Sequence, residues 1–395
     1  MIKKAVHAKE FLLSNDVTRD GYLLIEDGAF AEWTAEKPSS DYEIIDCPDA
    51  LIAPGLVDTH IHGRVGCDVM DCDISALKQI SADLPKQGVT SWLSTTLTEP
   101  TERLSLACAA AADYRDEQTS QASIGTLKEA RIEGVFLEGP FFTEKHKGAQ
   151  NPDFLCPPSF EKLQTWQEAA RGIIKKIAIA PEYEEALPFT QKAVDNGVVV
   201  GLAHTNATAD EALACIDAGA SIFIHTYNGM SGHHHRVPGV VSAALITADT
   251  TYGELICDGH HVHPLAAKIL LAAKGAQHIV LISDCIRAGG LPDGPSKLGE
   301  LDVIVKDGEA RLAEGGSLAG STIGLIQAVK NVVAWGMVDR FDALRMASTV
   351  PAAANNIDTT CGSIAPGRAA DFIVLDKDLN LLHTYIAGEE VYENA

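Results

Sequence analysis

Two histidines with one residue between them, His60 and His62, stand in the segment APGLVDTHIHG at positions 53–63. The apolar run before them is typical of a buried strand, and side chains two residues apart on a strand point to the same side. Both imidazoles can therefore contact one metal ion, for which imidazole is a common ligand. A His-x-His pair alone is weak evidence, so the prediction of a metal site depends on the residue types that follow later strands.

Further side chains that can bind a metal ion stand at the ends of later apolar runs. The run GVFLE ends at Glu138, VVVGLAH ends at His204, SIFIH ends at His225 and IVLISD ends at Asp284. Each residue alone has an ordinary explanation, because a histidine can be a hydrogen-bonded structural residue and a carboxylate can cap the next helix. Four histidines and two carboxylates in equivalent positions favour one shared metal site instead.

Imidazole and carboxylate ligands without thiolates suit zinc, iron, cobalt or manganese in a hydrolytic site. Such an ion with an open position lowers the pKa of a bound water to about 7 and polarises a carbonyl oxygen. Hydrolysis of an amide also needs a group that takes the proton of the water and delivers it to the leaving nitrogen. Asp284 is the candidate, because a carboxylate beside that water can do both. The alternative role for Asp284 is that of a metal ligand, and the two roles can overlap.

These side chains stand in a repeating pattern of apolar strands and helical segments. We predict strands that end near residues 62, 97, 138, 181, 204, 227, 258 and 284. The predicted helices cover residues 74–87, 101–117, 159–172, 184–196, 208–218, 238–248, 264–275 and 321–336. Eight strand–helix units in series predict a parallel α/β sheet closed into a TIM (β/α)8 barrel, whose active sites lie at the carboxyl ends of the strands.

The two ends of the chain differ from the middle. The first 52 residues hold short alternating segments, such as 22–25 and 29–33, separated by the turn residues Asp27 and Gly28. After a predicted helix over 341–354, residues 362–367 and 371–375 again read as β structure. We predict a small β-sandwich domain from residues 1–52 and 360–395, and a metal-dependent hydrolase barrel from residues 53–359.

The segment 286–319 interrupts the pattern between the eighth strand and its helix. It is rich in glycine and proline and contains the strand-like stretches 301–305 and 310–312. We therefore predict an ordered excursion of the chain near the site.

The composition indicates the size of the domains, excludes some classes of partner and predicts a location. The chain has 395 residues, of which 46% are hydrophobic, and this is enough for a large barrel with a smaller domain. Its net charge of -23 argues against nucleic acid or an anionic membrane as partner. The nine cysteines include no C-x-x-C pair, and no signal-peptide core or run of eighteen apolar residues is present. These features predict a cytoplasmic protein.

The motifs resemble those of the amidohydrolase superfamily and, within it, the family of N-acetylglucosamine-6-phosphate deacetylases. The resemblance covers nearly the whole chain, through PGLVDTHIHG, GVTSWLSTTLT, EGVFLEGPFF, KGAQNP, GLAHTNAT, HTYNGMSGHHHRVPG, ICDGHHVHP, ISDCIRAGG, LAGST and GSIAPGRAADFIVLD. Many superfamily members bridge two metal ions with a carbamylated lysine on strand four, where this chain has Ala180, Pro181 and Glu182. Glu138 resembles the deacetylase family's substitute, which counts against a dihydroorotase or hydantoinase.

The resemblance implies a role for each ligand. Glu138, His204 and His225 would hold the main catalytic metal ion, and His60 and His62 a second one, with Glu138 as a bridge. Some family members lack the His-x-His pair and work with one metal ion. We therefore expect one or two divalent ions per subunit, with zinc the first candidate and iron, cobalt or manganese as alternatives.

The resemblance also implies residues that act on the substrate. Asp284 would be the general acid/base, and His261 would hydrogen-bond the acetyl carbonyl and stabilise the oxyanion. Arg236 would bind the phosphate, since a guanidinium fork suits two oxygens, and in a homodimer it can serve the partner's site. The rest of the sugar-phosphate pocket would consist of Ala149, Gln150, Asn228, Gly229, Leu318, Ala319 and Gly320.

The implied reaction is hydrolysis of N-acetylglucosamine 6-phosphate to glucosamine 6-phosphate and acetate. One alternative is the same reaction on N-acetylgalactosamine 6-phosphate, because the two epimers differ at a single hydroxyl that the motifs do not distinguish. More remote alternatives are a deaminase or cyclic-amide hydrolase and a binding relative without catalysis. The motifs DGHH and HHHR count against the former, and the complete set of ligands counts against the latter.

Overall fold

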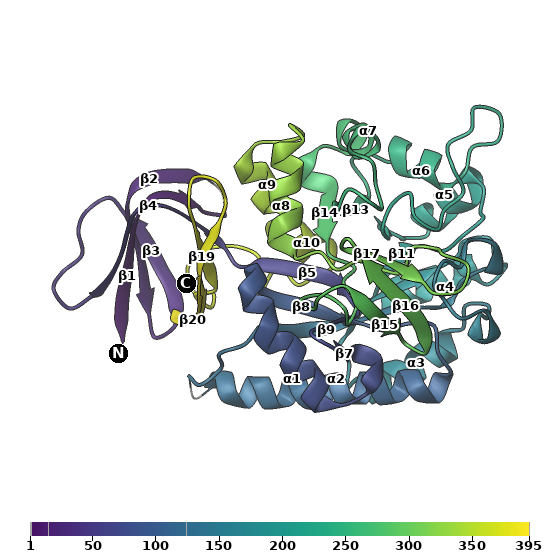
Figure 1. Ribbon diagram of the computed structural model, residues 1–395, viewed down its shortest axis with the longest axis horizontal. Coiled ribbons are helices and arrows are strands. Elements are labelled where there is room, and N and C mark those ends of the chain that lie inside the picture. Colours follow the sequence, from purple (N-terminus) through teal and green to yellow (C-terminus); the bar gives the residue numbers. More distant parts are fainter. Residues whose placement is uncertain (1, 15, 124, 395) are drawn as a thin grey trace.

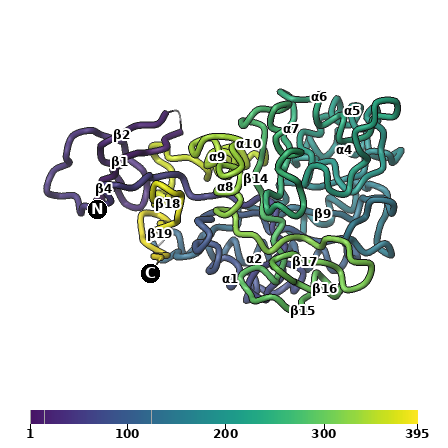
Figure 2. The backbone as a smooth tube through the Cα atoms, turned by 45° about the horizontal axis from the view of Figure 1, so that its top comes forward, coloured from purple at the N-terminus to yellow at the C-terminus, as the bar shows by residue number. Residues whose placement is uncertain are grey.

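The structure is a computed structural model that describes residues 2–14, 16–123 and 125–394. A barrel with helices around it makes up the larger part, and a small sheet lies beside it (Figure 1). The view in Figure 2 shows that both chain ends lie in the small sheet. In the described ranges, no helix is both long enough and apolar enough to cross a membrane.

Eight parallel strands form the barrel, as predicted. In spatial order they are β14 (Ile279–Ile282), β13 (Tyr252–Ile256), β12 (Ile222–Phe223), β11 (Val199–Leu202), β10 (Ile174–Ile179), β9 (Arg131–Phe141), β8 (Val89–Thr95) and β5 (Leu56–Ile61). A parallel bridge between Ile61 and Cys285 links the first strand to the last, and the Asp284 N–H donates to the carbonyl of His60 over 2.9 Å. The sheet therefore closes at its carboxyl edge, which is the edge where the predicted ligands stand.

Helices follow the strands at the predicted positions. They are α1 (Ile74–Asp83), α2 (Thr101–Ser123), α3 (Phe160–Ala169), α4 (Ala186–Asp195), α5 (Ala209–Asp217), α6 (Val240–Ile246), α7 (Pro264–Lys274) and α8 (Leu325–Ala334). Short 3-10 helices are η1 (Val69–Asp71), η2 (Leu84–Gln87), η3 (Glu144–His146), η4 (Pro152–Phe154) and η5 (Ala276–His278). The two-residue strands β6 (Gly63–Arg64) and β7 (Cys67–Asp68) form a small hairpin after β5.

The single helix predicted over 341–354 is wrong, because the structure has two helices there. They are α9 (Arg340–Met346) and α10 (Thr349–Ala354), and Ser348 between them has φ -137° and ψ -79°. An unbroken helix would need a hydrogen bond from residue 351 to the carbonyl of Ala347. Residue 351 is a proline, which has no N–H and whose ring would clash with that carbonyl.

Seven strands from the two ends of the chain form one continuous sheet. Their order is β20 (Glu389–Glu393), β19 (Leu381–Ile386), β18 (Phe372–Leu375), β4 (Glu43–Pro54), β1 (Lys3–Leu12), β2 (Val17–Glu26) and β3 (Ala29–Thr34). Phe30 on β3 and Phe372 on β18 have ring centroids 6.3 Å apart although three strands separate them in the sheet. The sheet therefore curls over its own apolar face, so that one sheet supplies both layers of the predicted sandwich.

The sheet joins strands from both ends of the chain, but the exact domain division stays a prediction. Strand β4 runs to Pro54, two residues beyond the predicted boundary, and leads directly into β5. The β structure predicted at 362–367 is wrong, because this stretch is a turn region. Its Gly367 N–H donates to the carbonyl of Phe30 over 2.8 Å and so ties the turn to β3.

The predicted excursion is a three-stranded antiparallel sheet at the barrel mouth (Figure 1). It consists of β15 (Gly294–Leu298), β16 (Leu301–Lys306) and β17 (Glu309–Leu312). Leu298, at the end of β15, lines the cavity over the ligands. The excursion therefore contributes part of the wall of the site.

A buried lysine gives a test of the packing around α7. Lys274 is 3% exposed, and its ammonium donates to the carbonyls of Thr247 and Thr251 and to the Thr251 hydroxyl. Burial lowers its pKa to about 8. The unfolded chain, with a lysine pKa of about 10.4, therefore binds more protons between these values, so this group makes the free energy of unfolding rise with pH across that window.

We expect Lys274→Met to remove this pH dependence. The free energy of unfolding of the wild type relative to the variant should grow between pH 8 and 10 by up to about 3 kcal/mol, at 1.4 kcal/mol for each pKa unit. Urea unfolding of both proteins at several pH values in this range measures the difference. A constant difference would show that Lys274 has an ordinary pKa in the folded protein.

Candidate metal centre and active site

Five of the predicted ligands converge at the carboxyl ends of the barrel strands. The metal-binding atoms of His60, His62 and Glu138 lie within 4.8 Å of one another, and so do those of Glu138, His204 and His225. All five side chains are buried. Glu138 belongs to both groups, and this is the position that a residue bridging two metal ions would need.

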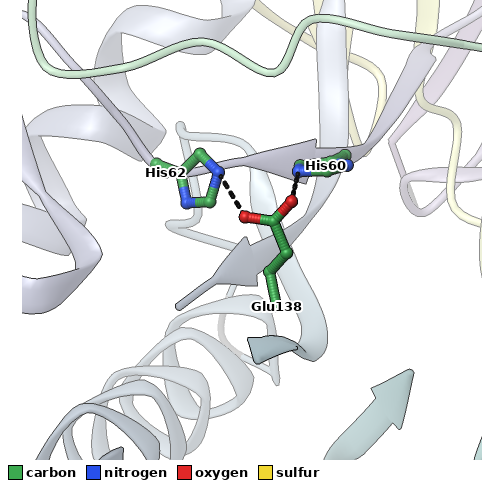
Figure 3. A group of neighbouring side chains, drawn as sticks. All are labelled: His60, His62 and Glu138. Carbon is green, nitrogen blue, oxygen red and sulfur yellow. Dashed lines mark ion pairs between the residues drawn. The ribbon is translucent and has the colours of Figure 1, made fainter. Parts of the chain in front are cut away.

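The carboxylate of Glu138 is the common partner of the four imidazoles. Its Oε1 lies 3.0 Å from His225 Nε2, 3.3 Å from His204 Nε2 and 3.5 Å from His60 Nε2. Its Oε2 lies 3.3 Å from His62 Nε2, and Figure 3 shows this carboxylate between His60 and His62. Four ring nitrogens therefore point at one carboxylate from two sides.

The donor atoms fit a divalent cation. The Nε2 atoms of His204 and His225 are only 3.1 Å apart, and two lone pairs at that distance repel each other unless a proton or a cation lies between them. The Nε2 of His60 is buried and has no hydrogen-bond partner among the described residues. Two or three imidazoles with a carboxylate are a typical ligand set for zinc and similar ions in catalytic sites.

The other ring nitrogen of each histidine has an acceptor, which fixes the tautomer. An acceptor at Nδ1 places the proton there and leaves the lone pair of Nε2 directed at the cluster. The acceptors are the Thr95 carbonyl for His62 at 3.3 Å, the His146 carbonyl for His204 at 3.0 Å, the Asn228 carbonyl for His225 at 3.1 Å and the Glu254 carboxylate for His60 at 3.0 Å.

Three site residues have backbone conformations that L-residues rarely adopt. The φ angles are +43° at His204, +31° at His225 and +49° at Asp284, in the left-handed region. Each such residue costs of order 1–3 kcal/mol, and such strain collects at functional sites. The loop after His225 also packs closely against His204, because a Cβ on Gly229, which has φ +61°, would lie 2.9 Å from His204 Nδ1.

Opposite charges shift the pKa values of the cluster in opposite directions. Burial by itself lowers the pKa of His60 and His62, but neighbouring carboxylates outweigh it and raise these values to about 9 and about 10. Burial raises the pKa of Glu138 and Asp284, but the histidines outweigh it and lower both values. A cation that binds here therefore replaces protons, so its affinity rises with pH.

A cavity of about 150 Å³ opens above the cluster. Its wall includes these predicted substrate-binding residues: Ala149, Gln150, Asn228, Gly229, His261, Leu318 and Gly320. Ala319 is fully buried behind the wall, and its N–H donates to the carbonyl of Ala310. Arg236 lies outside this wall, exposed in the loop before α6. The structure thus places the other predicted pocket residues at or directly behind the wall of this cavity, whereas Arg236 lies apart from them.

The two predicted catalytic side chains both line the cavity. Asp284 Oδ1 lies 3.4 Å from His60 Nε2 and 3.2 Å from His62 Nε2. The Nδ1 of His261 is 2.7 Å from Asp258 Oδ2, and the same carboxylate accepts the His261 backbone N–H. Asp258 thereby fixes the His261 ring and raises the pKa of this histidine against the opposing effect of burial.

Sequence reasoning missed two charged residues below the ligands. Strand β10 ends without a lysine, as predicted, but Lys176 in its middle is fully buried and pairs with Glu254 of β13. Lys176 stands beside the half-buried Lys175 in the strand IKKIAI, and Glu254 is the one charged residue of the strand YGELI. That signal was available in the sequence, since strands of a closed parallel sheet are buried on both faces.

Two further side chains support the ligands. Gln150, predicted to bind substrate, donates to Glu138 Oε2 over 2.8 Å and accepts the Thr98 N–H. Glu182, after β10, accepts the Thr143 hydroxyl over 2.6 Å and the Asn206 N–H over 2.8 Å. Glu182 therefore links the segment after β9, the strand that contains Glu138, to the segment after β11, which contains His204.

Asp58 and the cysteines near the site have structural roles. Asp58 is buried, and its Oδ1 accepts the N–H groups of His60 and Ser283, each over 3.3 Å. It thus holds the ends of β5 and β14 together. Cys257 and Cys285 are free and buried, and burial raises the pKa of the Cys285 thiol to about 11, which keeps it protonated.

With this fold and cluster in place, comparison with known proteins defines the class. A profile of the amidohydrolase family matches residues 51–391. This chain therefore belongs to the amidohydrolase family.

The relatives narrow the comparison within that family. The N-acetylglucosamine-6-phosphate deacetylase of Bacillus subtilis (strain 168) is 35% identical over 95% of this chain and 93% of its own length. The N-acetylgalactosamine-6-phosphate deacetylase of Escherichia coli O157:H7 is 36% identical over 97% of this chain and 98% of its own. A solved Mycobacterium smegmatis N-acetyl-D-glucosamine-6-phosphate deacetylase in complex with that sugar phosphate superposes with a TM-score of 0.89 and 30% identity, over 99% of this chain and all of that one.

The shared position of Glu138 leads to a prediction about metal binding. Glu138→Gln removes the carboxylate that is shared by the group of His60 and His62 and the group of His204 and His225. By contrast, His62→Ala removes a ligand from the first group alone. We expect the first variant to bind zinc at least about a hundredfold more weakly than the wild type, beyond the 10–100-fold loss typical of outer partners. Equilibrium dialysis followed by elemental analysis measures the affinity.

Glu133→Gln is the matched control. Glu133 is a buried glutamate on the same strand, β9, but it accepts hydrogen bonds from the hydroxyls of Ser91 and Thr360, away from the cluster. This variant should bind zinc as the wild type does. Equal zinc affinity of the wild type and Glu138→Gln would contradict the assignment of Glu138 as a ligand.

Proposed function

We propose that this protein is a metal-dependent deacetylase that hydrolyses N-acetylglucosamine 6-phosphate to glucosamine 6-phosphate and acetate. The observation that carries the proposal is the carboxylate of Glu138 between two pairs of imidazoles, under a cavity lined by Asp284 and His261. Relatives with this activity in their names match nearly the whole chain. The fold, the proposed ligands and the cavity support hydrolysis of an amide.

The metal would be held by Glu138, His204 and His225, with His60 and His62 forming a second position that shares Glu138. The chemistry supplied by a bound divalent metal is the polarisation of the acetyl carbonyl and the acidification of a water molecule. Zinc is the ion we propose first, and iron, cobalt and manganese suit the same ligand types.

Asp284 would move the proton. The neighbouring histidines lower its pKa, so it is ionised and can accept the proton of the attacking water. The same carboxyl would then deliver that proton to the nitrogen of the departing amine. Its Oδ1 lies 3.2 Å from His62 Nε2, so the role of metal ligand that the sequence left open stays open for this residue.

His261 would stabilise the oxyanion that forms on the acetyl group. Asp258 raises the pKa of His261 and so favours the imidazolium, in which both ring nitrogens carry protons. With Nδ1 bonded to Asp258, the Nε2 proton is available to the developing negative charge. A donor fixed in this way needs no reorganisation when the charge appears.

The substrate would bind with its sugar against the loops around Gln150, Asn228 and Leu318. Arg236 is the residue we propose for the phosphate. Because it is exposed and apart from the cavity of its own subunit, we propose that it serves the partner's site in a homodimer. The nine free cysteines fit the predicted cytoplasmic location, which stays a prediction.

N-acetylgalactosamine 6-phosphate is the second candidate substrate. The relative from Escherichia coli O157:H7 that is named for this sugar is as similar to this chain as those named for the gluco epimer. The same residues would catalyse the reaction on either sugar, so the choice rests on a single hydroxyl of the substrate.

An acetate-release assay on both sugar phosphates tests the proposal. Metal-stripped protein should be inactive, and protein reconstituted with zinc should release acetate with a higher kcat/KM on the gluco epimer. A higher kcat/KM on the galacto epimer would select the second candidate. If neither sugar yields acetate with zinc, iron, cobalt or manganese, the protein is a binding relative without this activity.

Asp284→Asn tests the proton-transfer step. An amide cannot accept the proton of water, so we expect kcat to fall at least about a hundredfold, within the range attributed to general acid–base catalysis. Metal content, measured by elemental analysis, should stay near that of the wild type. Asp302→Asn is the control, because Asp302 is an exposed carboxylate on β16. Activity of Asp284→Asn equal to that of this control would remove Asp284 from the role.

A further inference from the structure

Two charged side chains meet the ligand His60 in the interior of the barrel. Lys176 comes from β10 and Glu254 from β13, while His60 comes from β5, and all three are 0% exposed. These strands are not neighbours in the barrel sheet. The three side chains can meet only because each points inward below the cavity.

Glu254 contacts two of the predicted metal ligands at once. Its Oε2 accepts the Nδ1–H of His60 over 3.0 Å and the backbone N–H of His225 over 3.1 Å. Its Oε1 accepts the ammonium of Lys176 over 2.5 Å. One carboxylate therefore joins a ligand side chain, the backbone of a second ligand and a buried cation.

Lys176 contacts the backbone and the surroundings of His60. Its ammonium donates to the carbonyl of Thr59, the residue before His60, over 3.0 Å. It also lies 4.0 Å from the ring centroid of Phe136, and the Phe136 and His60 rings pack edge to face, with centroids 4.9 Å apart. Both the backbone and the ring of His60 thus depend on where Lys176 and Glu254 stand.

His60 differs from the other ligands in its acceptor. Among the four cluster histidines, all of them within the described residues, His60 is the one whose Nδ1 faces a carboxylate, while backbone carbonyls face the other three. A carboxylate partner fixes the ring and makes Nε2 a better donor to a metal than a carbonyl partner does. The charge of that carboxylate is balanced by Lys176, because an unpaired buried charge would be strongly destabilising.

We propose that Lys176 and Glu254 are a positioning pair that sets how tightly the group of His60, His62 and Glu138 holds its metal ion. Glu254 orients the His60 ring, and Lys176 holds Glu254 in place and balances its charge. The inference rests on the proposed function only in that it requires a metal ion at this group. Neither residue touches the substrate or takes part in proton transfer.

The test separates orientation from charge balance with two double variants of the full-length protein. Lys176→Met with Glu254→Gln removes both charges but keeps an acceptor for the His60 Nδ1–H. Lys176→Met with Glu254→Leu removes both charges and the acceptor. Each is stripped of metal and titrated with zinc alone in competition with a chromophoric chelator, and thermal unfolding reports on folding.

We expect the Leu-containing double variant to bind zinc 10–100-fold more weakly than the Gln-containing one, which in turn binds more weakly than the wild type. Each double variant should melt at a higher temperature than the single variant Lys176→Met, which leaves Glu254 unpaired. If the Leu-containing protein does not fold, the single variant Glu254→Gln replaces it, with zinc binding about tenfold weaker than that of the wild type.

Two controls match the buried charges. Glu133→Gln removes a buried glutamate of β9, and Lys274→Met removes a buried lysine of α7, both away from the cluster. Both should bind zinc as the wild type does. Folded Glu254 variants that bind zinc as tightly as the wild type would overturn the inference.

Measuring metal binding and acetate release on the same protein distinguishes a failure of this inference from a failure of the proposed function. A wild type that binds zinc but releases no acetate with zinc, iron, cobalt or manganese would overturn the proposed function and leave the positioning role standing. A wild type that binds none of these four ions would overturn both.

Discussion

The carboxylate of Glu138 faces the ring nitrogens of four histidines in a buried space, and the rest of the site is arranged around this group. Placing charges of both signs in the interior costs free energy unless each has a partner. The proposed cation would meet this requirement, because it replaces the protons that the histidines otherwise hold. The buried charges of the site therefore have to balance one another. This requirement explains why further hydrogen-bonding and charged side chains surround the proposed ligands.

Those partners come from several strands of the barrel and the loops after them. Below the ligands, Lys176 and Glu254 neutralise each other and hold His60. Beside the cavity, Asp258 fixes His261. The strained backbone at His204 and His225 is held by hydrogen bonds from their own rings to the carbonyls of His146 and Asn228, so folding energy from the whole barrel is used to keep the ligands in place.

The acidic surface and the proposed substrate pose an electrostatic constraint. A chain with net charge -23 repels a sugar phosphate at long range, so binding needs local positive charge at the cavity. The metal ion and the imidazolium of His261 would supply it at the acetyl end. For the phosphate, the exposed Arg236 would have to come from a second subunit, so assembly and substrate binding would be linked in this proposal.

The sequence by itself determined the barrel, its approximate strand ends and the residues proposed as ligands, because continuous apolar runs and metal-binding residue types are local properties. His60, His204 and His225 could be assigned to one rim since parallel strands end at a common edge. Only the tertiary structure decided the partners of His60, the break at Ser348, the curl of the small sheet and the separation of Arg236 from the cavity. These depend on which side chains meet across distant strands, and spacing along the chain does not encode those distances.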